Sequence, residues 1–133
     1  SLGEKIGARP RAVIRAMVNA SDDPLQVLTG CVAATEKLLR SQKLSVDDID
    51  LFEIHEAFAA TVLKLRADLE IPIEKLNVNG GVIAMGHPLG ATGSIMMGML
   101  LDEMERRDLT LGVVATSGAA GSGTAILIER LSS

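Results

Sequence analysis

The chain has 133 residues and a formal net charge of −4, and 47% of its residues are apolar. This length fits one domain and the apolar content can bury a core without disulfides or metal, so we expect residues 1–133 to form a single folded domain. The mildly acidic balance provides no basic stripe for a phosphate backbone, and only 2% of the residues are aromatic. Both features argue against nucleic acid as a partner.

One cysteine, Cys31, occurs in the chain. It cannot close an internal disulfide or complete a metal cage, which favours a reducing, cytoplasmic location. Its apolar neighbours predict a buried, inert thiol. The first ten residues carry charges and no apolar core like that of a signal peptide. No stretch reaches the roughly 18 uncharged apolar residues of a membrane span, so we expect a soluble protein without membrane contact.

The first half of the chain predicts two strands around a helix. Residues 11–20 alternate as a half-buried strand does. Residues 29–42 have the mixed apolar and charged pattern of an amphipathic helix, and residues 49–54 follow as a short apolar strand. The expected inward face of the first strand consists of Ala12, Ile14, Ala16 and Val18.

The second half predicts two helices and a hairpin. Residues 56–69 should form a helix that ends before Pro72, with a buried stripe of Phe58, Val62, Leu65 and Leu69. Pro88 is suited to be the first residue of a mostly buried helix that continues to about Arg107. Near its end, we expect ion pairs four residues apart, from Asp102 to Arg106 and from Glu103 to Arg107. Residues 111–116 and 124–130 predict a hairpin with a turn at 117–123.

The order of these elements predicts an α/β fold with a mostly parallel or mixed sheet covered by helices. Between the second and third helices lies the segment 77–93, which holds five glycines and leaves room for one more short strand. This segment is too rich in glycine for a helix or strand interior, which indicates a close approach of something to its backbone.

Candidate chemistry lies at the ends of the predicted elements. His55 and Glu56 follow a strand, Ser117 ends another, and His87 precedes a helix. Active sites of open α/β sheets lie at the carboxyl ends of strands. A helix N-terminus keeps a histidine ring neutral and available as a base or donor. Taken singly, each feature also has a structural interpretation: a helix cap, or a tight hairpin turn. The histidine spacing and single cysteine argue against a zinc site.

Three segments occur together in a distinctive order: HEAFAA at 55–60, NVNGGVIAMGHPLGATG at 77–93 and SGAAGSGTA at 117–125. They resemble the C-terminal half of a thiolase, and the stretches 10–24 and 44–59 resemble the same family. The resemblance implies one βαβαβαββ half of the two-domain thiolase fold. It also implies an acyl-CoA acyltransferase of fatty acid and lipid metabolism that cleaves 3-oxoacyl-CoA with coenzyme A or runs the reverse Claisen condensation.

The resemblance also assigns roles to the candidate residues. His87 matches the histidine that activates the nucleophile and directs a ring nitrogen at the thioester oxygen. His55 matches a position that helps to build the first oxyanion hole, and Glu56 would orient that region. The backbone amide of Ala119 matches a donor of the second oxyanion hole. Coenzyme A is expected as a substrate, and no resident cofactor is expected.

Ser117 departs from the family pattern, which has a second cysteine as the acid/base at this position. A thiol titrates near about 8.5, whereas a serine hydroxyl is a much weaker acid. Loss of a positioned acid/base costs on the order of 10²- to 10⁴-fold in rate. Ser117 fits either a natural thiolase-like relative or a deliberate substitution.

In thiolases the nucleophilic cysteine and most coenzyme A contacts belong to the N-terminal domain, which this chain lacks. We therefore expect the chain to be inactive alone and the full-length protein to be a homo-oligomer. One alternative is a catalytically silent thiolase-like binding or assembly module. Another is an α/β domain whose glycine loops serve only packing.

Overall fold

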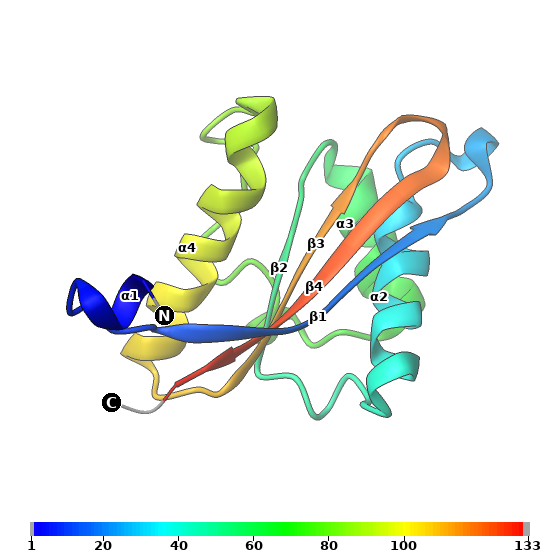
Figure 1. Ribbon diagram of the computed structural model, residues 1–133. Coiled ribbons are helices and arrows are strands. Elements are labelled where there is room, and N and C mark those ends of the chain that lie inside the picture. The colour runs from blue at the N-terminus through cyan, green and yellow to red at the C-terminus, as the bar shows by residue number, and fades with distance from the viewer. Residues whose placement is uncertain (1, 132–133) are drawn as a thin grey trace.

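The computed structural model describes residues 2–131 and shows a four-stranded mixed sheet between two layers of helices (Figure 1). The strand order is β1-β4-β3-β2; β4 runs antiparallel to both of its neighbours, and β2 runs parallel to β3. The strands are β1 (Ala12–Ser21), β2 (Leu51–Ile54), β3 (Leu111–Ser117) and β4 (Ser122–Arg130). The helices are α1 (Leu2–Lys5), α2 (Gly30–Gln42), α3 (Ala59–Leu69) and α4 (Thr92–Arg106). The predicted α/β class is confirmed.

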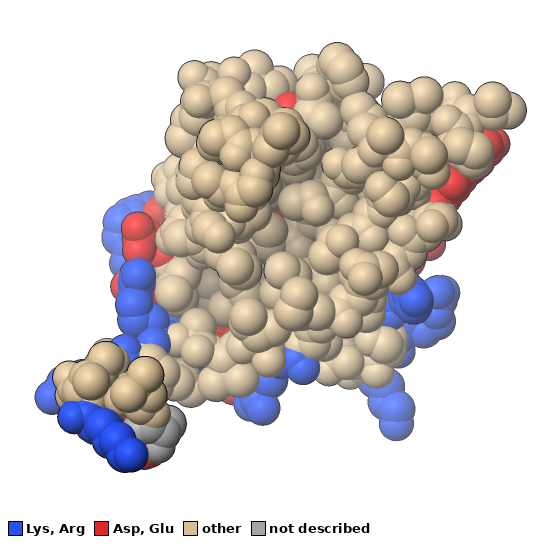
Figure 2. All heavy atoms as spheres, turned by 45° about the horizontal axis from the view of Figure 1, so that its top comes forward, with Lys and Arg blue, Asp and Glu red and all other residues tan. Residues whose placement is uncertain are grey.

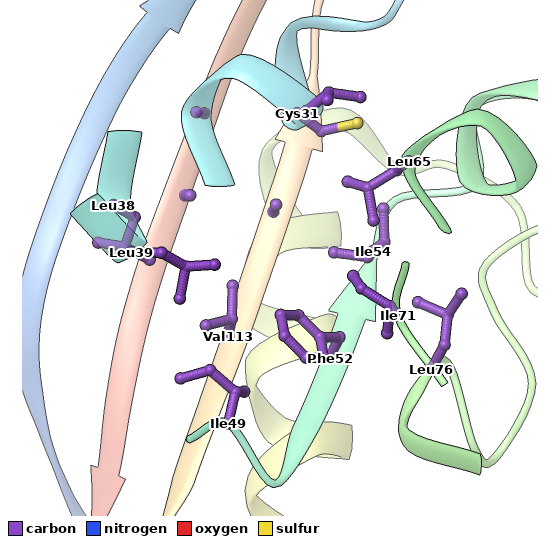
Figure 3. Packing of buried hydrophobic residues seen from close by; sticks show 14 of the residues in the cluster. Cys31, Leu38, Leu39, Ile49, Phe52, Ile54, Leu65, Ile71, Leu76 and Val113 are labelled. Atoms are coloured by element: carbon purple, nitrogen blue, oxygen red, sulfur yellow. The ribbon is translucent and has the colours of Figure 1, made fainter. Parts of the chain in front are cut away.

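The two helical layers enclose two apolar clusters, one on each face of the sheet. Alternation along β2 divides its side chains between them, because successive strand residues point to opposite faces. Phe52 and Ile54 pack with Leu38 of α2 and Leu65 of α3 (Figure 3). Leu51 points the other way and packs with residues of α4. The short strand β2 is therefore buried on both faces.

The edge strand β1 changes face partway along its length. A register shift between Ile14 and Ala16 marks a bulge in its pairing with β4. Beyond the bulge, Ala16 and Val18 pack against the cluster under α2. Ile14 is 52% exposed, so the prediction that it lies on the same inward face was wrong. The extra residue of a bulge moves the following side chains to the other face, which alternation in the sequence does not reveal.

Helix α3 begins three residues later than the predicted helix. Phe58, which precedes its first residue, has an extended backbone with φ −145° and ψ 152°. Its side chain is 62% exposed, whereas Leu65 of the same predicted stripe is fully buried. The prediction of a buried Phe58 was wrong, because this residue belongs to the loop that follows β2 and not to the helix. The helix ends where Glu70 adopts a left-handed conformation, before Pro72.

Helix α4 also starts later than expected and is buried on one side only. A separate 3-10 turn, Leu89–Ala91, precedes it. Pro88 does not begin the α-helix, because its ψ of 47° and the positive φ of Leu89 interrupt helical geometry. The expectation of a mostly buried helix was wrong. The buried residues of α4 are Thr92, Met96, Leu100, Glu103 and Met104.

Charged side chains at the end of α4 pair both with one another and with Arg11, the residue before β1. Glu103 accepts hydrogen bonds from Arg106 and Arg107, so the predicted Glu103–Arg107 pair is confirmed. The predicted Asp102–Arg106 pair was wrong, since Asp102 instead contacts Arg11 at 2.5 Å.

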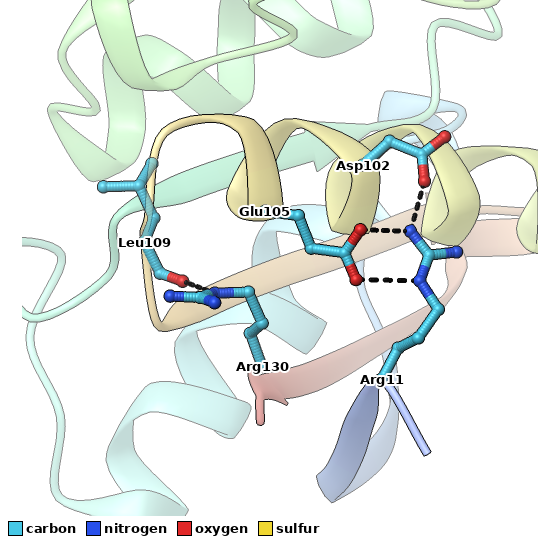
Figure 4. A network of polar contacts seen from close by, with 5 residues as sticks. All are labelled: Arg11, Asp102, Glu105, Leu109 and Arg130. Atoms are coloured by element: carbon cyan, nitrogen blue, oxygen red, sulfur yellow. Dashed lines mark hydrogen bonds and ion pairs between the residues drawn. The ribbon is translucent and has the colours of Figure 1, made fainter. Parts of the chain in front are cut away.

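Arg11 precedes β1 and also binds both carboxylate oxygens of Glu105 (Figure 4). Nearby, Arg130 at the end of β4 donates to the carbonyl of Leu109. These contacts fix the C-terminal part of α4 against the strand ends opposite the candidate site.

The remaining connections are short turns. Two further 3-10 turns are Pro24–Gln26 and Ile73–Lys75. In the described residues, the extra strand that the family pattern expects between α3 and α4 is reduced to one bridge between Phe52 and Leu76. Strands β3 and β4 form the predicted hairpin, joined by the turn Ala119–Gly121.

Candidate active site

The five residues predicted to carry the chemistry lie around one cavity at the carboxyl ends of β2 and β3. The cavity has a volume of about 600 Å³ and is lined by His55, Glu56, His87, Ser117 and Ala119, among others. His55 continues the ladder beyond β2, because its N–H donates to the carbonyl of Ala115 at 2.9 Å. The parallel pairing of β2 and β3 thus places His55 and Ser117 at the same edge of the sheet.

The two histidine rings lie against each other. Their centroids are 4.5 Å apart, and the ring planes are inclined by 43°. His87 is exposed, and its Nδ1 lies 2.7 Å from the hydroxyl of Thr92, the buried first residue of α4. The start of α4 therefore fixes the His87 ring and leaves Nε2 as the nitrogen available to a ligand.

His55 is the buried member of this pair. It is 4% exposed, and burial lowers its pKa, to which the neighbouring His87 adds. The ring is therefore neutral at pH 7, with one nitrogen as donor and the other as acceptor. Among residues 2–131, neither ring nitrogen has a hydrogen-bond partner.

Glu56 holds the glycine-rich segment against the end of β2. One carboxylate oxygen accepts from the side chain of Asn77 at 3.1 Å, and the other accepts from the N–H of Ile83 at 3.2 Å. A Cβ on Gly81 would lie 2.0 Å from the Glu56 carboxyl carbon. The glycine content predicted that some group approaches this backbone closely. At Gly81 that group is the Glu56 carboxylate. Glu56 shapes the loop that carries His87.

Asn77 is a structural element of the site that sequence reasoning did not single out. Its side chain accepts from the N–H of Ile54 at 2.7 Å and donates to the carbonyl of the same residue at 3.0 Å. It therefore pairs with the last residue of β2 much as another strand does. Its positive φ of 45° is unusual for most residues but accessible to asparagine. An asparagine at the start of a glycine-rich run was the available signal.

Ser117 is held by the first turn of α2. Its hydroxyl oxygen accepts a hydrogen bond of 2.9 Å from the N–H of Cys31. Backbones are packed so closely here that a Cβ on Gly123 would lie 2.0 Å from the carbonyl oxygen of Gly30. Cys31 itself is fully buried, as predicted, and burial raises the pKa of its thiol. This raised pKa disfavours the thiolate that a nucleophile requires.

The turn after Ser117 forms part of the cavity wall. Ala119 is exposed and lines the cavity wall. Its conformation is fixed by the Ser122 hydroxyl, which donates to the Ala119 carbonyl at 3.0 Å, and by the N–H of Gly118, which donates to the Ser122 carbonyl at 2.8 Å. Ala120 adopts the left-handed region with φ 56°.

The surface around the cavity is apolar. Figure 2 shows this face hollowed in its middle, with Lys and Arg only at its margins. The exposed apolar side chains that line the cavity are Phe58, Ile83 and Leu89. Within residues 2–131, no three His, Cys, Asp or Glu side chains are grouped to hold a metal ion. None of the helices in this range is long and apolar enough to span a membrane.

Known proteins share both the sequence and the fold. Residues 8–130 match the family model of the thiolase C-terminal domain. The chain is 46% identical over 129 residues to a 3-ketoacyl-CoA thiolase of Aeromonas hydrophila subsp. hydrophila, covering 95% of this chain and 33% of the relative. It is 43% identical over 125 residues to an acetyl-CoA acetyltransferase of Escherichia coli (strain K12), covering 94% and 32%.

A solved structure agrees with these matches. The crystal structure of the Bacillus anthracis acetyl-CoA acetyltransferase superimposes with a TM-score of 0.88 at 36% identity, over 98% of this chain and 33% of that protein. The chain therefore spans about a third of the length of these relatives. From the family model and these relatives together, we conclude that the chain belongs to the thiolase family and corresponds to its C-terminal domain.

Proposed function

We propose that this chain is the C-terminal domain of an acyl-CoA acyltransferase that cleaves 3-oxoacyl-CoA with coenzyme A or runs the reverse Claisen condensation. The observation that carries the proposal is the single cavity shared by His55, His87, Ser117 and Ala119. Family membership supports it, because the similar proteins bear the names 3-ketoacyl-CoA thiolase and acetyl-CoA acetyltransferase. Coenzyme A is a substrate in this proposal, and a cytoplasmic location remains a prediction.

The proposed reaction needs a nucleophile that holds the acyl group, a base, and donors for the oxyanions. His87 would act as the base that activates the nucleophile, through the Nε2 that Thr92 leaves available. Donors would come from the His55 ring and the backbone amide of Ala119. Glu56 would act as a positioning residue, since its carboxylate contacts the loop and not the cavity's two histidines.

The nucleophile would come from a separate N-terminal thiolase domain. The cysteine of this chain, Cys31, is fully buried and has a raised thiol pKa. We therefore expect the chain alone to show no thiolysis of a 3-oxoacyl-CoA with coenzyme A. The full-length protein should show thiolysis, and His87→Ala should reduce its kcat by about 10²-fold or more. Thiolysis by the isolated chain would refute this division of roles.

Ser117 favours a second candidate, a catalytically silent thiolase-like binding or assembly module. A hydroxyl that accepts a hydrogen bond from Cys31 replaces the thiol that acid/base chemistry prefers. Ser117→Cys in the full-length protein separates the two. A gain of about 10²-fold or more in kcat would indicate an enzyme weakened by the serine, whereas no gain would favour the silent module. Ser41→Cys, at the exposed end of α2 and outside the cavity lining, is the matched control and should give no gain.

The apolar surface around the cavity bears on assembly. Phe58, Leu89 and Ile83 are 62%, 77% and 59% exposed, and apolar patches of this kind mark contact sites. We therefore propose that the N-terminal domain covers this face. From the thiolase resemblance alone, we also propose that the full-length protein is a homo-oligomer. Sedimentation of the full-length protein tests the oligomeric state, and a monomer at working concentration would contradict it.

A further inference from the structure

Two residues of one strand face account for most of the unpaired buried polar atoms. Among residues 2–131, four buried side-chain nitrogen or oxygen atoms lack a hydrogen-bond partner, and three of them belong to Glu53 and His55. These side chains are only 3% and 4% exposed. Buried polar atoms are rarely left unpaired in proteins, and ordered water is the usual partner where the chain provides none.

Glu53 and His55 lie on the same side of the sheet. Alternation along β2 sends Phe52 and Ile54 to the cluster under α2 and α3, and Leu51 to the cluster under α4. The backbone hydrogen bond from His55 to Ala115 continues this alternation past the end of the strand. Residues two apart on a strand are roughly 6.5–7 Å apart. A carboxyl group and an imidazole that start at this separation on one face can be joined by a single water.

The two groups have complementary hydrogen-bonding capacities. Burial raises the pKa of Glu53 to about 8, and the nearby Glu56 adds to the effect. At pH 7 the side chain is therefore a neutral acid with one O–H donor. Burial lowers the pKa of His55, so its ring is neutral and has one acceptor nitrogen. The acid can donate to a water, and that water can donate to the ring.

We propose that Glu53 is a positioning residue for His55, bridged by one buried water to a ring nitrogen, and that it fixes the tautomer in which the second nitrogen keeps its hydrogen. This inference rests on the proposed function, in which His55 serves as a hydrogen-bond donor in the cavity. An ionised Glu53 is an acceptor only, so the water would turn, accept from the ring and favour the opposite tautomer. The His55 tautomer therefore depends on the proton of Glu53.

Two other titratable groups lie beside this pair, and a third is on α4, the helix that covers this face of the sheet. Glu56 affects both Glu53 and His55, and the His87 ring lies 4.5 Å from that of His55. On α4, Glu103 is ion-paired with Arg106 and has a pKa lowered to about 2, so its charge is constant near neutral pH. The tautomer change expected near pH 8 is thus separated from the titration of Glu103. Substitutions at position 53 show whether the tautomer change depends on Glu53 rather than on Glu56 or His87.

Nuclear magnetic resonance of ¹⁵N-labelled histidine in the full-length protein tests the proposal, with the His55 signal assigned from a His55→Asn variant. Wild type should show one neutral tautomer at about pH 7 and a shift toward the other at about pH 9. Glu53→Gln keeps a donor at every pH, so it should keep the first tautomer at both values. Glu53→Leu should give a mixture. Thr35→Val removes the fourth unpaired group, on α2, and should behave as wild type.

The proposal is overturned if Glu53→Gln follows the wild-type change between the two pH values, or if Glu53→Leu keeps a single tautomer. The Gln variant decides the matter even if the Leu variant does not fold. Thiolysis is measured in parallel on the same samples. Glu53→Leu should lower kcat with KM unchanged, by less than the roughly 10²–10³-fold that loss of a whole oxyanion donor costs. A wild-type protein with the expected tautomer but no thiolysis would instead refute the proposed function.

Discussion

Gly81→Ala is expected to destabilise the protein through one side chain, that of Glu56. The added Cβ would lie 2.0 Å from the Glu56 carboxyl carbon and 2.1 Å from one carboxylate oxygen. Because this is the end of a flexible side chain, the carboxylate can move away. It would then lose its hydrogen bonds of 3.1 Å to Asn77 and 3.2 Å to the N–H of Ile83.

The size of the effect follows from these two contacts. Both bonds are long, and the one from Asn77 is part-buried whereas the one from Ile83 is exposed. Their joint loss should lower the free energy of unfolding by about 1–3 kcal/mol. For a chain of 133 residues, an unfolding entropy of about 2.1 cal/mol/K per residue converts this to a fall in Tm of about 4–11 °C. Urea and thermal unfolding followed by circular dichroism measure both quantities.

A double-mutant cycle with Glu56→Ala tests the cause. In a protein that already lacks the carboxylate, Gly81→Ala should cost almost nothing, which gives an interaction energy of about 1–3 kcal/mol. Gly90→Ala is the matched control in the same loop, because its added Cβ meets no atom within 4 Å, and its effect should stay within about 0.5 kcal/mol. An equal cost of Gly81→Ala with and without Glu56 would refute the reasoning.

Three further predictions concern stability. Gly98→Ala lies in α4 with open space around its Cβ, so it should raise the free energy of unfolding by about 0.5–1 kcal/mol in urea titration, and a loss would contradict the helix assignment. Gly123→Ala would place a Cβ 2.0 Å from the backbone oxygen of Gly30, which cannot swing aside, so the yield of folded protein should collapse; near-normal stability would show that α2 does not touch β4 there. The pKa of Glu103 is lowered to about 2, first by Arg106, so its stabilising effect is present above about pH 4.5 and disappears as pH falls toward 2. The difference in stability between wild type and Glu103→Gln should therefore shrink across that window, and a constant difference would argue against the ion pair.

Residue patterns were sufficient to predict the α/β class and the hairpin. Alternation and helical spacing follow from local backbone geometry, and chain order limits how such elements can pack. His55 and Ser117 could be placed at one sheet edge because both follow strands, and the structure brings them to one cavity with His87. The thiolase resemblance rested on the same residues.

Contacts between distant segments could not be obtained from those patterns. The hydrogen bond of Cys31 to Ser117 joins residues 86 positions apart, and that of Ile83 to Glu56 joins residues 27 apart. Periodicity also indicates which side chains share a face but not what covers that face. Phe58 proved exposed because α3 begins only after it. Glu53, a carboxyl group in an apolar strand, proved buried, with one carboxyl oxygen lacking a partner among residues 2–131. Helices and strands follow from local backbone geometry, so the spacing of apolar residues in the sequence is enough to predict them. Burial, charge state and the fit of the glycine loop around Glu56 depend on the packing of the whole chain, and only the tertiary structure decided them.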